Sequence, residues 1–143
     1  MLFGKRKRIV NRILIVEDEP LTAFDNEKLI SEEGYEVVAT LDRYLDAAEA
    51  LEAEQVDLVL SDVRLRGDRT GIDLAMLARV KRIPVLFVTG APPENAAEFA
   101  IGCLQKPYGD RTLKAALAAV DKFLAGEKVS PPKGLTLYPS AAA

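Results

Sequence analysis

The stretch RILIVEDEP, residues 12–20, places four consecutive apolar residues directly before three carboxylates. Ile13–Val16 has the length and the β-branched content of a buried strand. Glu17, Asp18 and Glu19 follow without a break, although like charges repel one another and lose hydration at the edge of an apolar element. We therefore expect a positive charge beside them. A simpler alternative is that they begin a helix, whose N-terminus favours negative charge.

The composition excludes several classes of function. A chain of 143 residues that is 49% hydrophobic and 29% charged fits one globular domain with its own core. The net charge of −3 and the scattered Lys and Arg give no general attraction to nucleic acid. One cysteine and no histidine exclude an internal disulfide, a cysteine-built metal site and Ser–His or Cys–His catalysis. Any chemistry must therefore use carboxylates, hydroxyls, lysine and the backbone.

The two ends of the chain show no pattern that directs it to a membrane. No apolar run approaches the roughly 18 residues of a membrane span, and the start MLFGKRKR lacks the apolar part of a signal peptide. We expect a cytoplasmic protein without membrane insertion. Residues 1–10 are expected to form a basic leader and residues 126–143 a flexible Pro-rich tail, too short for a folded output domain. Docking of the tail segment LTLYP on the domain or on a partner is the alternative.

Short apolar runs of strand length recur along the chain, with helical patterns between them. Because strand and helix alternate and the strands are continuously apolar, we expect a parallel sheet covered on both faces, which is a doubly wound α/β fold with five strands. The further strands are expected at Val37–Ala39, Leu58–Leu60, Val85–Val88 and, weakly, Cys103–Leu104. The helical patterns include Leu21 with Phe24, then Tyr44–Leu51, then Ile72 with Ala75, Met76 and Val80, and most clearly Leu113–Leu124.

Polar side chains follow four of the expected strands, where the ligands of such sheets bind. Glu17 and Asp18 come after the first strand, Asp62 after the third, Thr89 after the fourth and Lys106 after the fifth. Three carboxylates meeting at one rim suit Mg²⁺, which prefers oxygen ligands. Lysine adds a mobile positive charge and threonine a hydroxyl donor. The group suits phosphoryl transfer, which needs in-line positioning and charge neutralisation, with Asp62 as the nucleophile.

The motifs ILIVEDEP, DLVLSDVRL, LFVTG and LQKPY stand in this order over roughly residues 10–125, and they resemble the receiver domain of two-component response regulators. The resemblance implies a flavodoxin-like (βα)5 fold over residues 11–125, with a five-stranded parallel sheet in the order 2-1-3-4-5. It also implies cis geometry at the Lys106–Pro107 bond.

What the resemblance implies about the site can be stated residue by residue. A histidine kinase would donate a phosphoryl group to Asp62. Asp18 would hold Mg²⁺ directly, Glu17 would hold it through water, and the backbone carbonyl of Arg64 would supply another ligand. Thr89 and Lys106 would contact the phosphoryl oxygens.

A narrower resemblance concerns the segments PVLFVTGAP and DVRLRGDRTGIDLA, which look like the FATGUY-type stand-alone receivers of alphaproteobacterial general stress signalling. Phe87, Thr89 and Gly90 match the motif, whereas Val88 and Pro92 replace its alanine and tyrosine. The expected function is a single-domain response regulator that catalyses only its own phosphorylation and dephosphorylation. Its partners would be a sensor histidine kinase and a downstream regulator or phosphotransfer protein, contacted through the fourth and fifth helices. The alternative is an adaptor that binds a kinase or regulator without phosphorylation.

Two departures from the receiver pattern bear on the switch. Cys103 stands three residues before Lys106, where receivers usually carry an aromatic ring, so coupling through that ring cannot operate in its usual form. We expect Cys103 to be a small core residue. Only 16 residues separate Thr89 from Lys106, which leaves room for a fourth helix of about two turns. We expect this helix to be short and labile, and phosphate on Asp62 to reorder residues 90–100.

Overall fold

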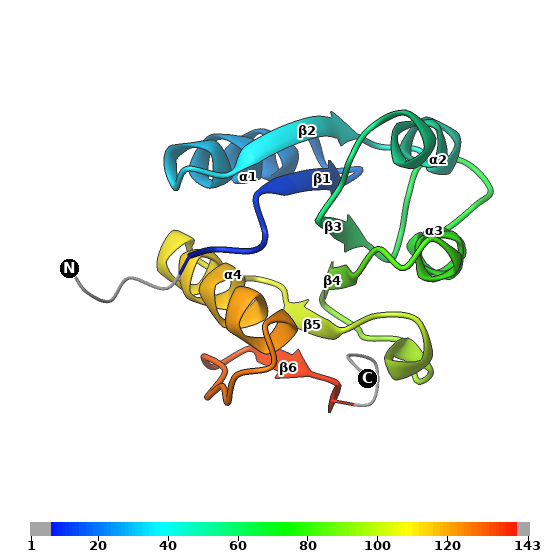
Figure 1. Cartoon of the computed structure of the whole chain (residues 1–143). Helices are drawn as coiled ribbons and strands as arrows, with labels where there is room; N and C mark the ends of the chain where they lie inside the picture. The colour runs from blue at the N-terminus through cyan, green and yellow to red at the C-terminus, as the bar shows by residue number, and fades with distance from the viewer. Residues whose placement is uncertain (1–6, 140–143) are drawn as a thin grey trace.

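Six strands form one sheet at the centre of the computed structural model, which describes residues 7–139 (Figure 1). The strands are β1 (Arg12–Val16), β2 (Glu36–Leu41), β3 (Leu58–Asp62), β4 (Val85–Thr89), β5 (Gly102–Gln105) and β6 (Leu135–Leu137). The helices are α1 (Pro20–Glu32), α2 (Tyr44–Ala53), α3 (Gly71–Val80) and α4 (Asp110–Leu124), with a short 3-10 helix η1 (Ala96–Glu98).

The strand order β2-β1-β3-β4-β5-β6 confirms the doubly wound, flavodoxin-like α/β fold for the first five strands, which all pair in parallel. β6 adds a sixth strand, antiparallel to β5. The carboxyl ends of β1, β3, β4 and β5 therefore lie along one edge of the sheet, and this edge carries the polar residues singled out from the sequence.

Two apolar layers explain why the strands are continuously apolar. Successive side chains of a strand point to opposite faces, and both faces of this sheet are covered by helices, α1 and α4 on one side and α2 and α3 on the other (Figure 1). In β1, for example, Ile13 and Ile15 pack in the layer beneath α4, while Leu14 and Val16 pack in the layer beneath α2 and α3. Sheet residues of β1, β3 and β4 are thus buried on both sides.

The helices lie where the sequence patterns place them, but two of their buried faces differ from those patterns. In α1 the apolar residues Leu21 and Phe24 are 72% and 65% exposed, and the helix packs through Ala23, Asn26, Leu29 and Ile30 instead. In α3 the pattern residues Met76 and Val80 are likewise exposed. The inner faces of these helices contain small and polar residues, so a prediction based on large apolar residues does not identify the face that packs on the sheet. The regular pattern of α4 is confirmed.

The expected fourth helix is replaced by the three-residue η1, so the prediction of about two helical turns is too long. Pro92 and Pro93 precede it and lack the backbone N–H that a helix needs beyond its first turn. Its packing depends on small residues, since Ala96 and Ala100 are buried beside Phe87 and Cys103.

Residues 135–137 correct the expectation of a flexible tail, because they form β6 and Leu135 is buried against the α4 layer. The alternative, docking of the LTLYP segment on the domain, is confirmed. Apolar residues alternate in this segment, so that Leu135 and Leu137 both face α4. Residues 140–143 of the tail and residues 1–6 of the expected leader lie outside the described residues.

The end of the leader is fixed to the domain. The backbone N–H groups of Ile9 and Val10 donate to the buried carboxylate of Asp121 on α4 at 2.9 and 2.7 Å. Val10 itself is buried in the core. Within residues 7–139, no helix combines the length and apolar character that crossing a membrane requires.

The two-layer core predicts a clear contrast between two leucines. Leu14→Ala, at a side chain with no exposure in β1, should lower the free energy of unfolding by about 2–5 kcal/mol, because it removes apolar contacts and leaves a cavity. Leu45→Ala, at a 71% exposed position on α2, is the matched control and should change it by less than about 0.5 kcal/mol. Urea unfolding measures both, and equal losses would contradict the assigned packing.

Candidate functional site

The three carboxylates after β1 divide into two roles. Glu19 is the N-cap of α1: its side chain accepts a hydrogen bond from the Leu21 N–H at 3.0 Å, and Pro20 occupies the first helical position. Its carboxylate also accepts from the Thr22 hydroxyl, which together with the Leu21 N–H lowers the pKa of Glu19. The helix-start alternative therefore holds for Glu19, while Glu17 and Asp18 turn towards the end of β3.

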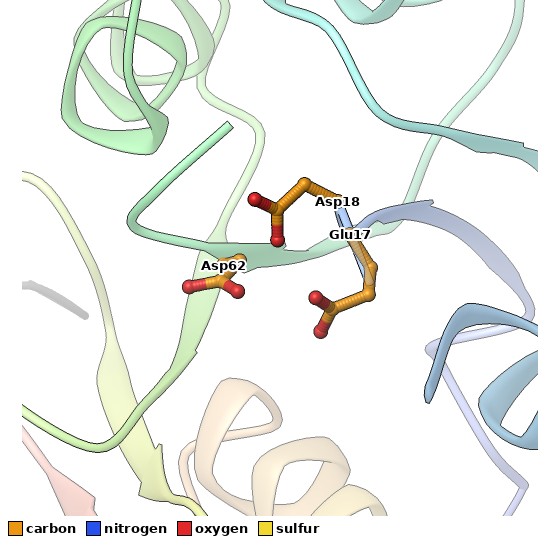
Figure 2. A group of neighbouring side chains, drawn as sticks. All are labelled: Glu17, Asp18 and Asp62. Carbon is orange, nitrogen blue, oxygen red and sulfur yellow. The ribbon is translucent and has the colours of Figure 1, made fainter. Parts of the chain in front are cut away.

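Glu17, Asp18 and Asp62 converge from the ends of β1 and β3 (Figure 2). One carboxylate oxygen from each lies within 4.8 Å of the others. Glu17 and Asp62 are buried, whereas Asp18 is half-buried. The chain leaves β1 in a fixed direction because the Glu17 N–H donates to the Leu41 carbonyl at 2.8 Å. The structure thus brings together the three acidic residues predicted as metal ligands.

Lys106 supplies the positive charge that the sequence predicts beside the acidic residues 17–19. Its Nζ lies 2.8 Å from Oε1 of Glu17 and 2.9 Å from Oδ2 of Asp62. Burial by itself would lower the pKa of the Lys106 ammonium, but its hydrogen bonds to the two carboxylates outweigh this and raise the pKa to about 12. The lysine therefore stays charged at neutral pH and ties the end of β5 to the ends of β1 and β3.

The ionised form of the Glu17 carboxylate is disfavoured in the acidic cluster. Burial raises the pKa of Glu17, and the neighbouring charge of Asp62 acts in the same direction. The ammonium of Lys106 and the Glu19 N–H, 3.2 Å from Oε2 of Glu17, work against this rise without cancelling it. A further cation at the cluster would therefore stabilise the ionised form of Glu17.

Thr89 ends β4 beside Asp62 and lines the same pocket, which has a volume of about 380 Å³. Its hydroxyl oxygen accepts from the Ala91 N–H at 3.2 Å, and the hydroxyl contacts the Ala91 carbonyl at 3.4 Å. The Lys106 N–H donates to the Thr89 carbonyl at 3.0 Å, which joins the ends of β4 and β5. The pocket lining is Asp62, Val63, Arg64, Thr89, Gly90, Ala91 and Lys106.

Arg64 lies at the rim of the pocket in the loop after β3. Its backbone N–H donates to Oδ1 of Asp62 at 3.3 Å, so Asp62 does cap this turn while its other oxygen binds Lys106. The role of the Arg64 carbonyl as a metal ligand stays a prediction. The Lys106–Pro107 bond is cis, as the resemblance implies.

Gly71 is a positioning residue that the sequence analysis does not single out. It begins α3, and a Cβ at this position would lie 2.0 Å from the Asp62 carbonyl oxygen and 3.0 Å from Val63 Cα. The Gly71 N–H donates to the Val63 carbonyl at 2.7 Å. Only glycine lets the start of α3 approach the Asp62 backbone this closely. The glycine in RTGID, nine residues after Asp62, is the signal that could have revealed it.

Tyr108 and Cys103 belong to the packing around the site. The Tyr108 hydroxyl accepts a hydrogen bond from Nδ2 of Asn26 at 2.9 Å, and burial raises the pKa of Tyr108. Through this contact Tyr108 packs on α1. Cys103 is 3% exposed in the layer with Phe87, which confirms it as a core residue.

The Lys106 contacts predict a pH-dependent loss of stability. Lys106→Met leaves Glu17 without its cation, so the folded-state pKa of Glu17 rises further above the unfolded value, and stability is lost as pH rises through that raised value. At neutral pH we expect a loss of about 2–3 kcal/mol, and almost none in acid. Lys114→Met is the control, since its ion pair with Glu33 is 3.5 Å long and exposed, and it should cost less than about 1 kcal/mol. Urea unfolding from pH 3 to 8 distinguishes this from a uniform loss.

Cys103 should resist thiol reagents in the folded protein. Burial raises the pKa of its thiol to about 11, so the reactive thiolate is scarce at neutral pH and shielded from reagents. The absorbance change with a disulfide reagent should be slow for the native chain and fast after denaturation. Rapid reaction under native conditions would show that the β5 region opens readily.

Comparisons with known proteins agree with this geometry. Residues 13–118 match the response regulator receiver domain family. The transcriptional regulatory protein PdtaR of Mycobacterium tuberculosis is 34% identical over 122 residues, which cover 80% of this chain and 59% of PdtaR. The crystal structure of the response regulator PhyR from Brucella abortus superposes with a TM-score of 0.69 at 29% identity, over 84% of this chain and 51% of PhyR.

A third comparison concerns the fold alone. The receiver domain of sensor histidine kinase PA1611 from Pseudomonas aeruginosa, solved with a magnesium ion coordinated in its active site cleft, superposes with a TM-score of 0.65 at 24% identity, over 76% of this chain and 94% of that domain. The chain spans little more than half the length of PdtaR and PhyR. The family match includes the ends of all five parallel strands, including those that carry the acidic cluster, Thr89 and Lys106, and the chain therefore belongs to the response regulator receiver domain family.

Proposed function

We propose that this chain is a response regulator that accepts a phosphoryl group on Asp62 from a sensor histidine kinase in a Mg²⁺-dependent reaction. The observation that carries the proposal is the position of Asp62. Its carboxylate is paired with Lys106 at 2.9 Å and lies beside the carboxylates of Glu17 and Asp18. It lines a pocket of about 380 Å³ that Thr89 also lines. A phosphoryl group needs a nucleophile, positive charge and hydroxyl or amide donors within one pocket.

The donor set of the acidic cluster fits Mg²⁺. Carboxylate oxygens of Glu17, Asp18 and Asp62 lie together, and within residues 7–139 no histidine or cysteine belongs to the group. We propose that Asp18 and Asp62 contact the ion directly, that Glu17 holds it through water, and that the Arg64 carbonyl completes the protein ligands. When bound, Mg²⁺ would supply charge neutralisation at the phosphoryl oxygens.

Asp62, Lys106 and Thr89 would each have a separate role in the phosphoryl transfer. In the transfer, a carboxylate oxygen of Asp62 forms a bond to phosphorus while the bond between phosphorus and the kinase histidine nitrogen breaks, and the electron pair of that bond stays on the nitrogen. Lys106 is charged and within reach of the product, so its Nζ would pair with a phosphoryl oxygen. Thr89 would donate its hydroxyl to another oxygen, giving up its contact with the Ala91 carbonyl.

The signalling role extends this chemistry to partners. We propose a cytoplasmic signalling protein that modifies only itself and acts on a downstream regulator or phosphotransfer protein. Support for a stress role comes from PhyR, since one PhyR of known structure is described as a stress response regulator. The competing proposal is an adaptor that binds its partner without phosphorylation, and it keeps the fold but makes no use of the pocket.

Acetyl phosphate tests the chemistry without the kinase. Intact-protein mass should rise by one phosphoryl group in the natural chain with Mg²⁺, and stay unchanged without Mg²⁺ and in Asp62→Asn. Asp46→Asn, an exposed carboxylate at the start of α2, is the matched control and should be modified like the natural chain.

A mass gain that persists in Asp62→Asn would place the modification elsewhere and contradict the assigned nucleophile. No gain in the natural chain, together with no change in amide spectra on adding beryllofluoride and Mg²⁺, would favour the adaptor.

A further inference from the structure

β6 is attached to the domain through the two ends of β5. The Gln105 N–H donates to the Gly134 carbonyl at 2.9 Å, and the Tyr138 N–H donates to the Ile101 carbonyl at 2.8 Å. The strand between these bonds has three residues and lies at the edge of the sheet. Short edge strands, which are paired on one side only, belong to the less stable parts of a fold. Opening of β6 would leave the pairings of the five parallel strands intact.

The absence of a side chain at Gly102 on β5 makes room for β6. A Cβ at Gly102 would lie 2.5 Å from the Thr136 carbonyl oxygen and 3.0 Å from the Leu137 side chain. Both atoms belong to β6, and no atom of the site is among these contacts. The glycine thus permits the close approach of β6.

β6 is also joined to the segment that leaves Thr89. Tyr138 packs against the apolar cluster that also contains Cys103, Ala96 and Ala100. That segment is held to Thr89 at one end through the Ala91 contacts, and it bonds to Tyr138 at the other end through Ile101. The other end of β6 bonds to Gln105, the neighbour of Lys106. One attachment point of β6, Gln105, is thus the neighbour of Lys106, and the other, Ile101, is connected to Thr89 through the segment 90–101.

We propose that the outer edge of β5 is a strand-docking surface that residues 134–138 occupy while Asp62 is free and vacate when Asp62 carries a phosphoryl group. This inference rests on the proposed function. When the Thr89 hydroxyl turns to a phosphoryl oxygen, the Ala91 contacts break, and the segment that follows has η1 as its regular structure and is held at its far end by the bond from the Ile101 N–H to the Val85 carbonyl at 2.9 Å. A shift transmitted along this segment to the Ile101 carbonyl and to the apolar cluster that holds Tyr138 would then weaken the attachment of β6.

Detachment of β6 would uncover the unpaired N–H and C=O groups of β5 and the apolar positions that Leu135 and Leu137 cover. An uncovered strand edge of this kind pairs with an extended segment that has apolar residues at alternate positions. Loading of Asp62 would thus create a surface for protein contacts on the side of the sheet next to α4.

Amide hydrogen exchange of the natural chain, read by NMR with and without Mg²⁺ and beryllofluoride, tests the coupling. The Ala91 amide reports loading of the site, and the Tyr138 and Gln105 amides report β6. We expect the Tyr138 and Gln105 amides to exchange about tenfold faster or more on loading, with no change in Asp62→Asn. The Asp57 amide, which donates to the Arg12 carbonyl far from β6, is the internal control.

The possible results separate the two proposals. If the Ala91 amide shifts while the Tyr138 and Gln105 amides keep their exchange rates, the detachable strand is wrong and the phosphoacceptor site stands. If the Ala91 amide does not respond and acetyl phosphate adds no mass, the proposed function itself fails, and the inference fails with it.

Gly102→Ala tests the same coupling from the opposite direction. Its Cβ should open β6 without loading, so the Tyr138 amide exchanges fast at rest. Because coupling between two sites is reciprocal, the variant should bind beryllofluoride with Mg²⁺ more tightly than the natural chain, by about tenfold. Gly109→Ala is the matched control, since a Cβ there meets nothing within 4 Å. Equal affinity in a Gly102→Ala chain whose Tyr138 amide is already open would overturn the inference.

Discussion

The contact of the Lys106 ammonium with two buried carboxylates is the interaction on which the rest of the site depends. Glu17 and Asp62 come from different strands, and each would repel the other without the lysine between them. The lysine supplies one positive charge against three carboxylates, so the cluster remains short of positive charge when all three are ionised. In the proposed function this deficit would favour a further cation at the cluster, and Asp62 as the nucleophile would lie next to a group that can stabilise the product.

The fold keeps this unfavourable arrangement in place because the surrounding elements are rigid. The parallel sheet brings four strand ends to one edge, and both faces of the sheet are buried. Gly71 lets α3 begin directly against the Asp62 backbone, and Glu19 caps α1 so that Glu17 and Asp18 turn towards Asp62. Two elements after Thr89, η1 and β6, are by contrast short, with three residues each. Buried strands on one side of the site and short elements on the other suit a site in which a change of charge alters the conformation of neighbouring segments.

The apolar runs predict the five parallel strands, and the residues that follow them predict the members of the site, because strand ends in a parallel sheet share one edge. The strand order is what the resemblance to receiver domains implies. The errors of the sequence-based prediction have physical causes. The packing faces of α1 and α3 depend on Ala23, Asn26 and Ala78, which carry little hydrophobic signal, whereas exposed Phe24 and Val80 carry much. β6 is hidden by the prolines before it, and its docking depends on the missing side chain of Gly102, a contact between segments distant in the chain. The role of Gly71 likewise depends on a distance that no local pattern records.

Paramagnetic broadening by Mn²⁺, which shares the oxygen-ligand preference of Mg²⁺, tests the central claim that the lysine-held carboxylates form one cation site. With substoichiometric Mn²⁺, the amide resonances of residues 17–19 and 62–64 should broaden first in the natural chain, and this effect should be lost in Asp18→Asn. Broadening spread over the exposed acidic residues, or the same pattern in Asp18→Asn, would show that the cluster binds no cation of its own.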